Sequence, residues 1–290
     1  MTYIAPYMRR KHAAVLLAIS VGLTLGACGG GNAEPGAAAT SLQGRVVVVN
    51  TPDGLNAPDK KELAMELVSS SENSTLDWKS QYAIIEDIGD ERGYTAGLVG
   101  FTSATDDMLD LVKAYTVAEP GNILSQYLPA LQQVNHSASH AGLDPNFVPD
   151  WKNAATDPVF QQAQMNVLNA QYFDPAVILA KQDGLGTLGQ FIYYDAIVMH
   201  GPGSAKKPHS LQGIRAAALL KALPPARKGD ETAYLAAFLD ARRALMLTES
   251  DHKHNIDRID TQQRLFLTSG NLNLNTPLSW KVNHDPYQIN

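Results

Sequence analysis

The sequence predicts a mainly α-helical fold with one small antiparallel sheet. From about residue 55 onward, apolar residues recur at helical spacing over most of the chain. One segment, residues 94–102, has the composition of strands and follows a turn that contains glycine. The chain has 290 residues, of which 44% are hydrophobic. This composition is typical of a globular protein and excludes collagen-like and fully disordered classes.

The N-terminus predicts an export signal. Residues 1–12 carry three basic residues and no acid, and an apolar run of about 15 residues follows, which is the length of a secretory signal rather than of a membrane span. The only cysteine, Cys28, comes directly after Leu25, Gly26 and Ala27, and this ending resembles the cleavage box of bacterial lipoproteins. We therefore predict a signal peptide over residues 1–27 and lipidation of Cys28. The alternative is an ordinary signal peptide followed by an unrelated cysteine.

The residues after Cys28 predict a tether. Residues 29–44 contain hardly any large apolar side chain, so they cannot bury enough surface to fold. We expect a flexible tether over residues 28–54 and a folded part over residues 55–290. A single cysteine also excludes an intramolecular disulfide.

The first predicted helix begins at Pro58 and ends in the polar cluster 69–74. Its apolar residues are spaced for one helix face: Leu63, Ala64, Leu67 and Val68. The glycine-flanked turn 89–93 then leads into the strand segment. Asp106 is predicted to cap the next helix, and apolar spacing indicates another helix over residues 122–134.

The C-terminal half predicts four further helices. Asp157 and Asp174 each precede a proline, a pattern typical of a cap followed by the first helical residue. Residues 187–200 are apolar nearly all round, which indicates a central helix buried on every side. Residues 231–249 form the last long helix expected.

Two carboxylates are candidates for a general acid and a general base. Glu72 lies four residues after Val68, so its carboxyl would project from the apolar face at the helix end, where burial raises a carboxyl's affinity for a proton. Asp90 lies in the glycine-flanked turn, where a side chain can face a cleft. A glycosidase needs two carboxyls in unequal environments. A solvated Glu72 at a frayed helix end and an Asp90 selected for turn geometry remain the alternatives.

Asp195 interrupts the most apolar predicted helix, where an unpaired carboxylate would be very costly. It therefore requires a cationic or hydrogen-bonding partner. Arg242 has the helical phase to point into the core, and Arg258 precedes another apolar segment. A buried Arg–Asp–Arg cluster is expected, either as part of an active site or as a purely architectural ion pair.

Other function classes are disfavoured. The formal charge of −6 becomes −9 without residues 1–27, which leaves 20 bases against 29 acids, and this does not suit a nucleic-acid binder. The glycine pattern at 184–189 follows a predicted helix rather than a strand, so it does not predict a dinucleotide site. His136 and His140 lie in a loop-like stretch without the glutamate of a zincin. No metal and no cofactor are predicted.

Many segments, in order, resemble the family 46 chitosanases. The segments that carry the resemblance include ELAMELVSSSENS (62–74), DWK (77–79), IEDIGD (85–90), RGYT (92–95), EPGNIL (119–124), YYDAIVMHGPG (193–203) and FLDAR (238–242). The resemblance covers residues 55–290. It implies a two-lobed, lysozyme-like α+β fold with a small antiparallel sheet beside the catalytic cleft. It also implies endo-acting, inverting hydrolysis of β-1,4 bonds between the glucosamine units of chitosan, a cationic polysaccharide.

The resemblance also implies roles for individual residues. Glu72 matches the general acid, Asp90 the general base and Thr95 the residue that helps to hold the attacking water. Asp195, Arg242 and Arg258 match a buried charge network that supports the acid. The positions that match sugar contacts are Asp107, Arg92, His200, Asn73 and Glu249.

The sequence leaves open two other functions. One is a lysozyme-like peptidoglycan hydrolase, which the acidic composition disfavours, and the other is a lipoprotein that binds polysaccharide without cleaving it. Residues 204–212 look longer and more basic than is usual in the family, and Ile84 stands where relatives can carry tyrosine. We expect an exported monomer, extracellular or at the cell surface, that is attached to a membrane only through a lipid on Cys28.

Overall fold

The computed structural model describes residues 54–249 and 252–290, which lie in one compact unit that runs to the C-terminus. The predicted signal peptide, Cys28 and nearly all of the predicted tether lie outside the described residues.

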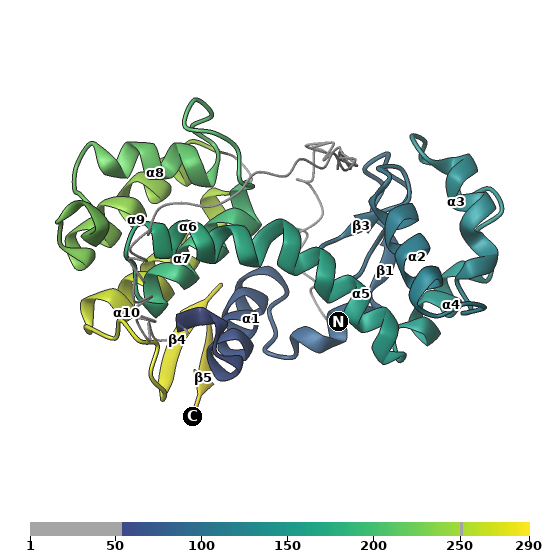
Figure 1. The fold of residues 1–290 in the computed structure, drawn as a ribbon, viewed down its shortest axis with the longest axis horizontal. Helices are drawn as coiled ribbons and strands as arrows, with labels where there is room; N and C mark the ends of the chain where they lie inside the picture. The colour runs from purple at the N-terminus through teal and green to yellow at the C-terminus, as the bar shows by residue number, and fades with distance from the viewer. Residues whose placement is uncertain (1–53, 250–251) are drawn as a thin grey trace, which may run out of the picture. The chain divides into compact units, whose positions relative to one another are not determined.

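Helices make up most of the described residues (Figure 1). The α-helices are α1 (Pro58–Glu72), α2 (Asp107–Ala118), α3 (Leu128–Val134), α4 (Phe147–Ala154), α5 (Pro158–Leu168), α6 (Asp174–Gln182), α7 (Thr187–His200), α8 (Leu211–Leu219), α9 (Glu231–Thr248) and α10 (Arg264–Thr268). Two π-helical segments, η5 (Asn169–Phe173) and η8 (Arg258–Gln263), run directly into α6 and α10. The predicted mainly helical fold is confirmed.

The strand segment predicted at 94–102 is two strands of a three-stranded antiparallel sheet. β2 (Tyr94–Ala96) pairs on one side with β1 (Ile85–Asp87) and on the other with β3 (Phe101–Thr102). A second antiparallel pair, β4 (Leu278–Val282) and β5 (Asp285–Ile289), was not predicted. In β4, buried and exposed residues alternate, as in a strand with one face on the core.

Helix α7 lies in the core, as its composition predicts. From Thr187 to Ile197 every residue is buried. Helix α6 packs against α7, α8 packs against α9, and α1 also contacts α7. Because α7 is surrounded, a polar side chain on it can be paired only inside the protein.

Two of the predicted caps differ from the structure. Helix α2 begins directly after Asp106, as predicted, but the side chain of Asp106 makes no capping hydrogen bond because it binds Asn135. The neighbouring Asp107 accepts from the backbone N–H of Met108 at 2.9 Å. Asp174 is not an N-cap, because it is the first residue of α6 and η5 runs directly into it. Asp157 is a cap as predicted, accepting from the N–H of Val159 at 2.8 Å.

The helix predicted over residues 122–134 is shorter than expected. Asn122 accepts hydrogen bonds from the N–H groups of Leu124 and Ser125 in a turn. A short 3₁₀ segment and then α3 follow. The polar side chain of Asn122 thus delays the start of the helix.

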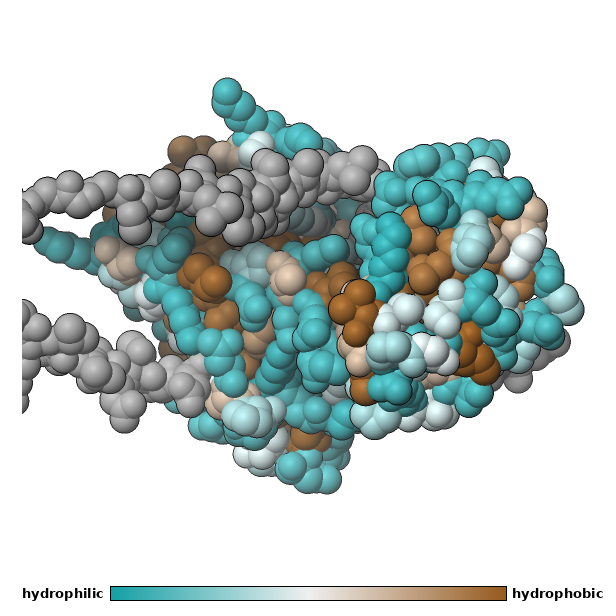
Figure 2. Space-filling model, turned by 45° about the vertical axis from the view of Figure 1, so that its right-hand side comes forward, coloured by the Kyte–Doolittle hydropathy of each residue, from teal (hydrophilic) through white to brown (hydrophobic). Residues whose placement is uncertain are grey.

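Large exposed apolar side chains are scattered over several elements: Val117, Ile178, Leu220, Leu223, Leu247 and Leu265. On the face drawn in Figure 2, apolar areas are interrupted by hydrophilic ones. Among the described residues, no helix has the length and apolar character needed to cross a bilayer.

Candidate active site

The end of α1 meets α7, α9 and η8 at a group of buried charges. Glu72 is the last residue of α1, Asp195 lies in α7, Arg242 in α9, and Arg258 is the first residue of η8. Glu72 is 2% exposed and the other three are 0% exposed. We call these four residues the buried charge cluster. Two carboxylates and two guanidiniums give the cluster a formal charge of zero.

The contacts run through the cluster from one end to the other. Arg242 Nη1 donates to Asp195 Oδ2 at 2.5 Å. Arg258 Nη2 lies 3.4 Å from Asp195 Oδ1 and donates to Glu72 Oε1 at 2.5 Å. Gln263 Nε2 also donates to Asp195 Oδ2, at 2.7 Å. Asp195 thus contacts both guanidiniums, and Arg258 joins Asp195 to Glu72.

The cluster keeps Asp195 ionised. Burial alone would raise the pKa of Asp195, but the charges of Arg258 and Arg242 outweigh it and hold the pKa below its usual value. The predicted meeting of Asp195, Arg242 and Arg258 is therefore present in the structure.

Glu72 lies at the helix end on the buried face, as expected from its spacing to Val68. Its surroundings differ from the apolar surface that the sequence suggests. The carboxylate meets the guanidinium of Arg258, which comes from 186 residues later in the chain. Helical spacing cannot foresee a partner at that distance.

Asp90 lies in the turn between β1 and β2. Arg92 Nε donates to Asp90 Oδ2 at 2.8 Å, and the backbone N–H of Arg92 donates to Oδ1 at 3.2 Å. The side chain of Asp90 is 19% exposed. Asp90 is therefore held in a fixed orientation by its neighbour and is still accessible to solvent.

Thr95 and Asp107 lie around the same sheet. Thr95 pairs with Thr102 across β2 and β3, and its buried hydroxyl has no hydrogen-bond partner among the described residues. Asp107 Oδ1 accepts from the N–H of Thr102 at 3.0 Å and from the hydroxyl of Thr105 at 2.9 Å. Burial raises the pKa of Asp107 to about 6, although these hydrogen bonds oppose the shift.

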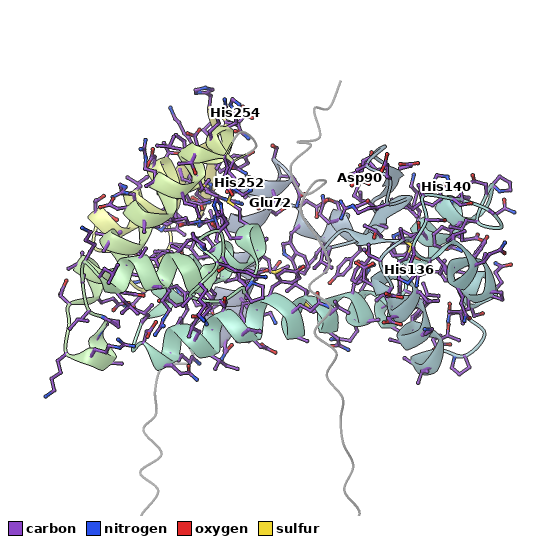
Figure 3. All side chains as sticks on the ribbon, turned by 90° about the horizontal axis from the view of Figure 1, so that it is seen from above. Glu72, Asp90, His136, His140, His252 and His254 are labelled. Carbon is purple, nitrogen blue, oxygen red and sulfur yellow. The ribbon has the colours of Figure 1, made fainter. Side chains whose placement is uncertain are left out.

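The predicted acid and base belong to different groups of contacts. Figure 3 shows Glu72 on the side of His252, whereas Asp90 lies on the side of His136 and His140. No hydrogen bond or ion pair joins Glu72 to Asp90 in the part of the chain that the structure describes.

Three histidines surround Glu249, which caps the C-terminus of α9. His252 Nδ1 contacts Glu249 Oε2, and His209 Nδ1 lies 2.5 Å from Oε1. The ring of His200, the last residue of α7, lies 5.2 Å from that of His252. We call His200, His209, Glu249 and His252 the Glu249 cluster. Burial and the charge of Arg258 lower the pKa of His252 to about 4, so its ring is neutral at neutral pH.

The Glu249 cluster is linked to the buried charge cluster. Arg242 Nε donates to His200 Nε2 at 3.2 Å while its Nη1 binds Asp195. A predicted sugar contact, His200, is thus one hydrogen bond away from the network that supports the predicted acid.

The remaining predicted site residue is Asn73, the cap after α1. Its N–H donates to the carbonyl of Ser69 at 2.7 Å, so the residue next to Glu72 is fixed in position. The two loop histidines have separate partners: His140 stacks on Tyr94, with centroids 4.0 Å apart, and His136 lies 3.9 Å from Asp106. The glycine pattern at 184–189 follows α6 rather than a strand.

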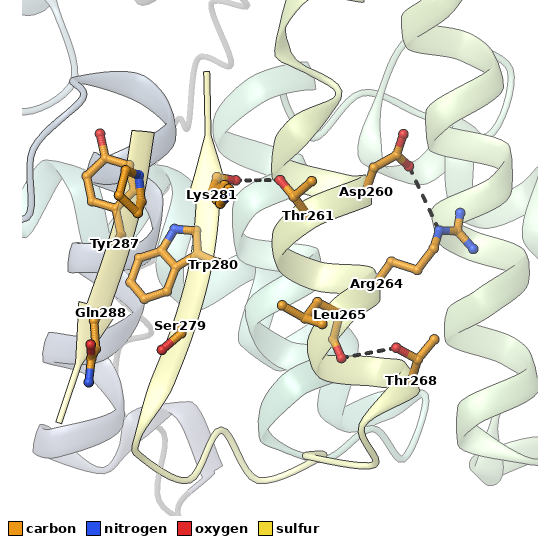
Figure 4. Close-up of a pocket in the computed structure, with 11 residues that line it drawn as sticks. Asp260, Thr261, Arg264, Leu265, Thr268, Ser279, Trp280, Lys281, Tyr287 and Gln288 are labelled. Carbon is orange, nitrogen blue, oxygen red and sulfur yellow. Dashed lines mark hydrogen bonds and ion pairs between the residues drawn. The ribbon is translucent and has the colours of Figure 1, made fainter. Parts of the chain in front are cut away.

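A groove of about 770 Å³ lies between the C-terminal hairpin and η8 with α10 (Figure 4). Trp280 and Tyr287 stack along it, and Arg264 pairs with Asp240 at 2.8 Å nearby. None of the predicted site residues lines this groove. Its basic side chains, Arg264 and Lys281, also do not suit a cationic polymer.

Sequence reasoning missed Gln263, His209 and His252. Gln263 follows Arg258 by five residues, and the π-helical turn of η8 brings both side chains to Asp195. A search at α-helical spacing does not pair positions five apart. His209 lies 40 residues from Glu249 in the chain, so only the folded chain shows that they meet. His252 follows Glu249 by three residues, beyond the end of α9, where no helical spacing was expected.

The comparisons with known proteins agree with one another. The model of "Glycosyl hydrolase family 46" matches residues 66–278. The chain is 57% identical to a chitosanase of Streptomyces sp. (strain N174), over 98% of this chain and all of the relative. It is 34% identical to a chitosanase of Bacillus subtilis (strain 168), over 79% of this chain and 84% of the relative.

Solved structures are similar as well. A co-crystal structure of chitosanase OU01 with substrate has a TM-score of 0.73 at 53% identity, covering 82% of this chain and 99% of the other. A chitosanase from Gynuella sunshinyii in complex with chitotetraose has a TM-score of 0.67 at 32% identity, covering 79% of this chain and 97% of the other. The family match and these identities establish that the chain belongs to glycosyl hydrolase family 46.

Proposed function

We propose that this chain is an endo-acting, inverting chitosanase that cleaves β-1,4 bonds between glucosamine units. The observation that carries the proposal is the 57% identity over 98% of the chain to a chitosanase. The two carboxylates that the proposal needs, Glu72 and Asp90, are both present, one buried in an ion-pair network and one in a solvent-accessible turn.

In this mechanism Glu72 protonates the leaving oxygen, and Asp90 takes a proton from the water that attacks the opposite face of the sugar. Inversion requires the two carboxyls to be about 6.5–9.5 Å apart when substrate is bound, which leaves room for that water. Thr95 supports the step because its buried hydroxyl needs a hydrogen-bond partner, and a water held by Asp90 would supply one.

The buried charge cluster would allow Glu72 to gain and lose a proton. A proton on Glu72 weakens its ion pair with Arg258, and Asp195 then remains as the counterion of that guanidinium. Glu72 can therefore change its charge without leaving Arg258 unpaired in the interior.

The sugar contacts would be made by Arg92, Asp107, His200, Asn73 and Glu249. Chitosan is a polycation when its amines are protonated, and carboxylates recognise ammonium groups. The charge of −9 without the first 27 residues attracts such a chain at a distance.

The test is release of reducing ends from fully deacetylated chitosan by the chain from residue 45. Glu72→Gln and Asp90→Asn should each lower kcat by about 10²- to 10⁴-fold. Asp110→Asn is the matched control, since this side chain is 68% exposed and pairs with the exposed Lys113. Proton NMR during the first turnovers should show the α-anomer, because inversion of a β bond produces it.

Bacterial cell wall is the second substrate in the same assay. Cleavage of wall but not of chitosan would identify a lysozyme-like hydrolase. Binding of chitosan by the parent chain without any cleavage would identify a non-catalytic polysaccharide-binding protein.

We propose in addition that the chain is exported, that Cys28 is lipidated after cleavage of residues 1–27, and that the folded part is a monomer on a tether. The support is the basic and apolar leader followed by the only cysteine. Expression in a bacterial host should place the protein in the membrane fraction, with an N-terminal lipopeptide visible by mass spectrometry. Cys28→Ala should release it, and light scattering of that soluble form gives its oligomeric state.

A further inference from the structure

We propose that His200, Glu249 and His252 bind a divalent transition-metal ion of the Zn²⁺ type. Each residue offers one ligand atom, and these atoms all lie within 4.8 Å of one another. Two imidazoles and one carboxylate are a known ligand set of zinc sites that keep a fourth position open. Mg²⁺ and Ca²⁺ prefer oxygen ligands, so they fit this set poorly.

The three residues converge from different segments of the chain. His200 is the last residue of α7, Glu249 follows α9, and His252 precedes a 3₁₀ turn, Lys253–Asn255. Zinc bonds of 2.0–2.1 Å in a tetrahedron place ligand atoms about 3.4 Å apart. An inward movement of roughly 1.4 Å at most would close the shell, which is within the reach of side-chain rotation at two helix ends.

His209 provides an outer contact for the site. Its Nδ1 lies 2.5 Å from Glu249 Oε1, the oxygen opposite the one that contacts His252. Such outer hydrogen bonds orient a ligating carboxylate. The side chain of His209 is 54% exposed, so this side of the Glu249 cluster lies at the surface.

The guanidinium of Arg242 limits the affinity. Arg242 Nε donates to His200 Nε2 at 3.2 Å. A neutral imidazole that binds a metal through one nitrogen carries its proton on the other, so this hydrogen bond is lost whichever nitrogen binds. We therefore expect binding weaker than at a structural zinc site.

The metal would also inhibit the enzyme. This step rests on the proposed function, in which His200 and Glu249 contact the sugar chain. An ion that occupies both side chains removes them from chitosan, and it also disturbs Arg242, which binds Asp195. Zn²⁺ should therefore raise the KM for chitosan.

The test is isothermal titration of the full chain with Zn²⁺, without chitosan, in a Cys28→Ser background that removes the only thiol. We expect one ion per chain. His252→Gln and Glu249→Gln should each weaken binding at least tenfold, and thermal unfolding shows whether either variant is folded. His254→Gln is the matched control, since this exposed histidine lies two residues from His252 (Figure 3). Co²⁺ in place of Zn²⁺ should give the visible absorption of a tetrahedral site, lost in the same two variants.

No binding by the parent chain overturns the site, as does binding that persists in both folded variants or is lost in His254→Gln. Binding with an unchanged KM overturns the competition with chitosan and leaves the metal site standing. A chain that binds Zn²⁺ but never cleaves chitosan, even with the metal removed, contradicts the proposed function instead.

Discussion

Replacement of Asp195 by asparagine should destabilise the protein strongly. The variant keeps the shape of the side chain but changes the formal charge of the buried charge cluster from zero to +1. Arg242 loses its charged partner at 2.5 Å and Arg258 loses the one at 3.4 Å, and both guanidiniums are 0% exposed. Removing one partner of a buried ion pair costs about 3–5 kcal/mol. At about 2–4 °C per kcal/mol for a domain of this size, the Tm should fall by about 6–20 °C.

Thermal unfolding followed by circular dichroism measures this loss, and urea titration gives the free energy. Asp110→Asn, the same chemical change at an exposed position, should stay within about 0.5 kcal/mol of the parent. Asp195→Asn combined with Arg242→Gln restores the charge balance, so the double variant should lose less than the sum of the single losses. An unchanged Tm for Asp195→Asn, or strictly additive losses, would refute the account of the buried charge cluster.

The stability that Asp195→Asn loses relative to the parent depends on pH. The folded-state pKa of Asp195 lies below the value of about 3.9 for an unfolded chain. Its ionised form therefore stabilises the fold above that pH, and the contribution disappears as the pH falls through the folded-state pKa. The difference in stability between parent and Asp195→Asn should be constant near neutral pH and shrink below about pH 4.

Further variants test other contacts. Gln263→Leu removes one donor to Asp195 and should cost about 1–3 kcal/mol, less than Asp195→Asn. Asp107→Asn keeps its acceptor oxygen, so it should fold normally but raise the KM for chitosan. Because the folded-state pKa of Asp107 is about 6, the parent should gain stability relative to this variant as the pH falls from about 6 to 4. His252 has a folded-state pKa of about 4, so the parent loses stability as the pH falls from about 6.5 to 4. This part of the loss should be absent in His252→Gln. Urea titrations at several pH values measure the difference.

The sequence predicted features that depend on local spacing or on the cost of burial. The apolar residues around Asp195 in the sequence predicted that its carboxylate needs a cationic or hydrogen-bonding partner. The helical phase of Arg242 indicated which residue that partner could be. The cap at Asp157 followed from its place before proline. In each case the physical cause acts within one element or on one side chain.

Contacts with a distant segment of the chain could not be predicted in this way. Aspartate is a residue type typical of N-caps, but the side chain of Asp106 binds Asn135, which follows the C-terminus of α3. The partner of Glu72 comes from η8, where the π-helical turn changes the spacing. The hairpin of β4 and β5 did show alternation at Leu278, Trp280 and Val282, but five residues are too few to separate a strand from other short apolar runs.

Asp195 lies on a continuous path of contacts between the predicted acid and the predicted sugar contact His200. From Glu72 the contacts pass through Arg258 to Asp195, then through Arg242 to His200. Since Asp195 supplies the only carboxylate that touches both guanidiniums among the described residues, a change there moves both ends of the path. Variants of Asp195 that still fold should therefore alter kcat and KM together. Variants of His209, which contacts Glu249, should alter KM alone.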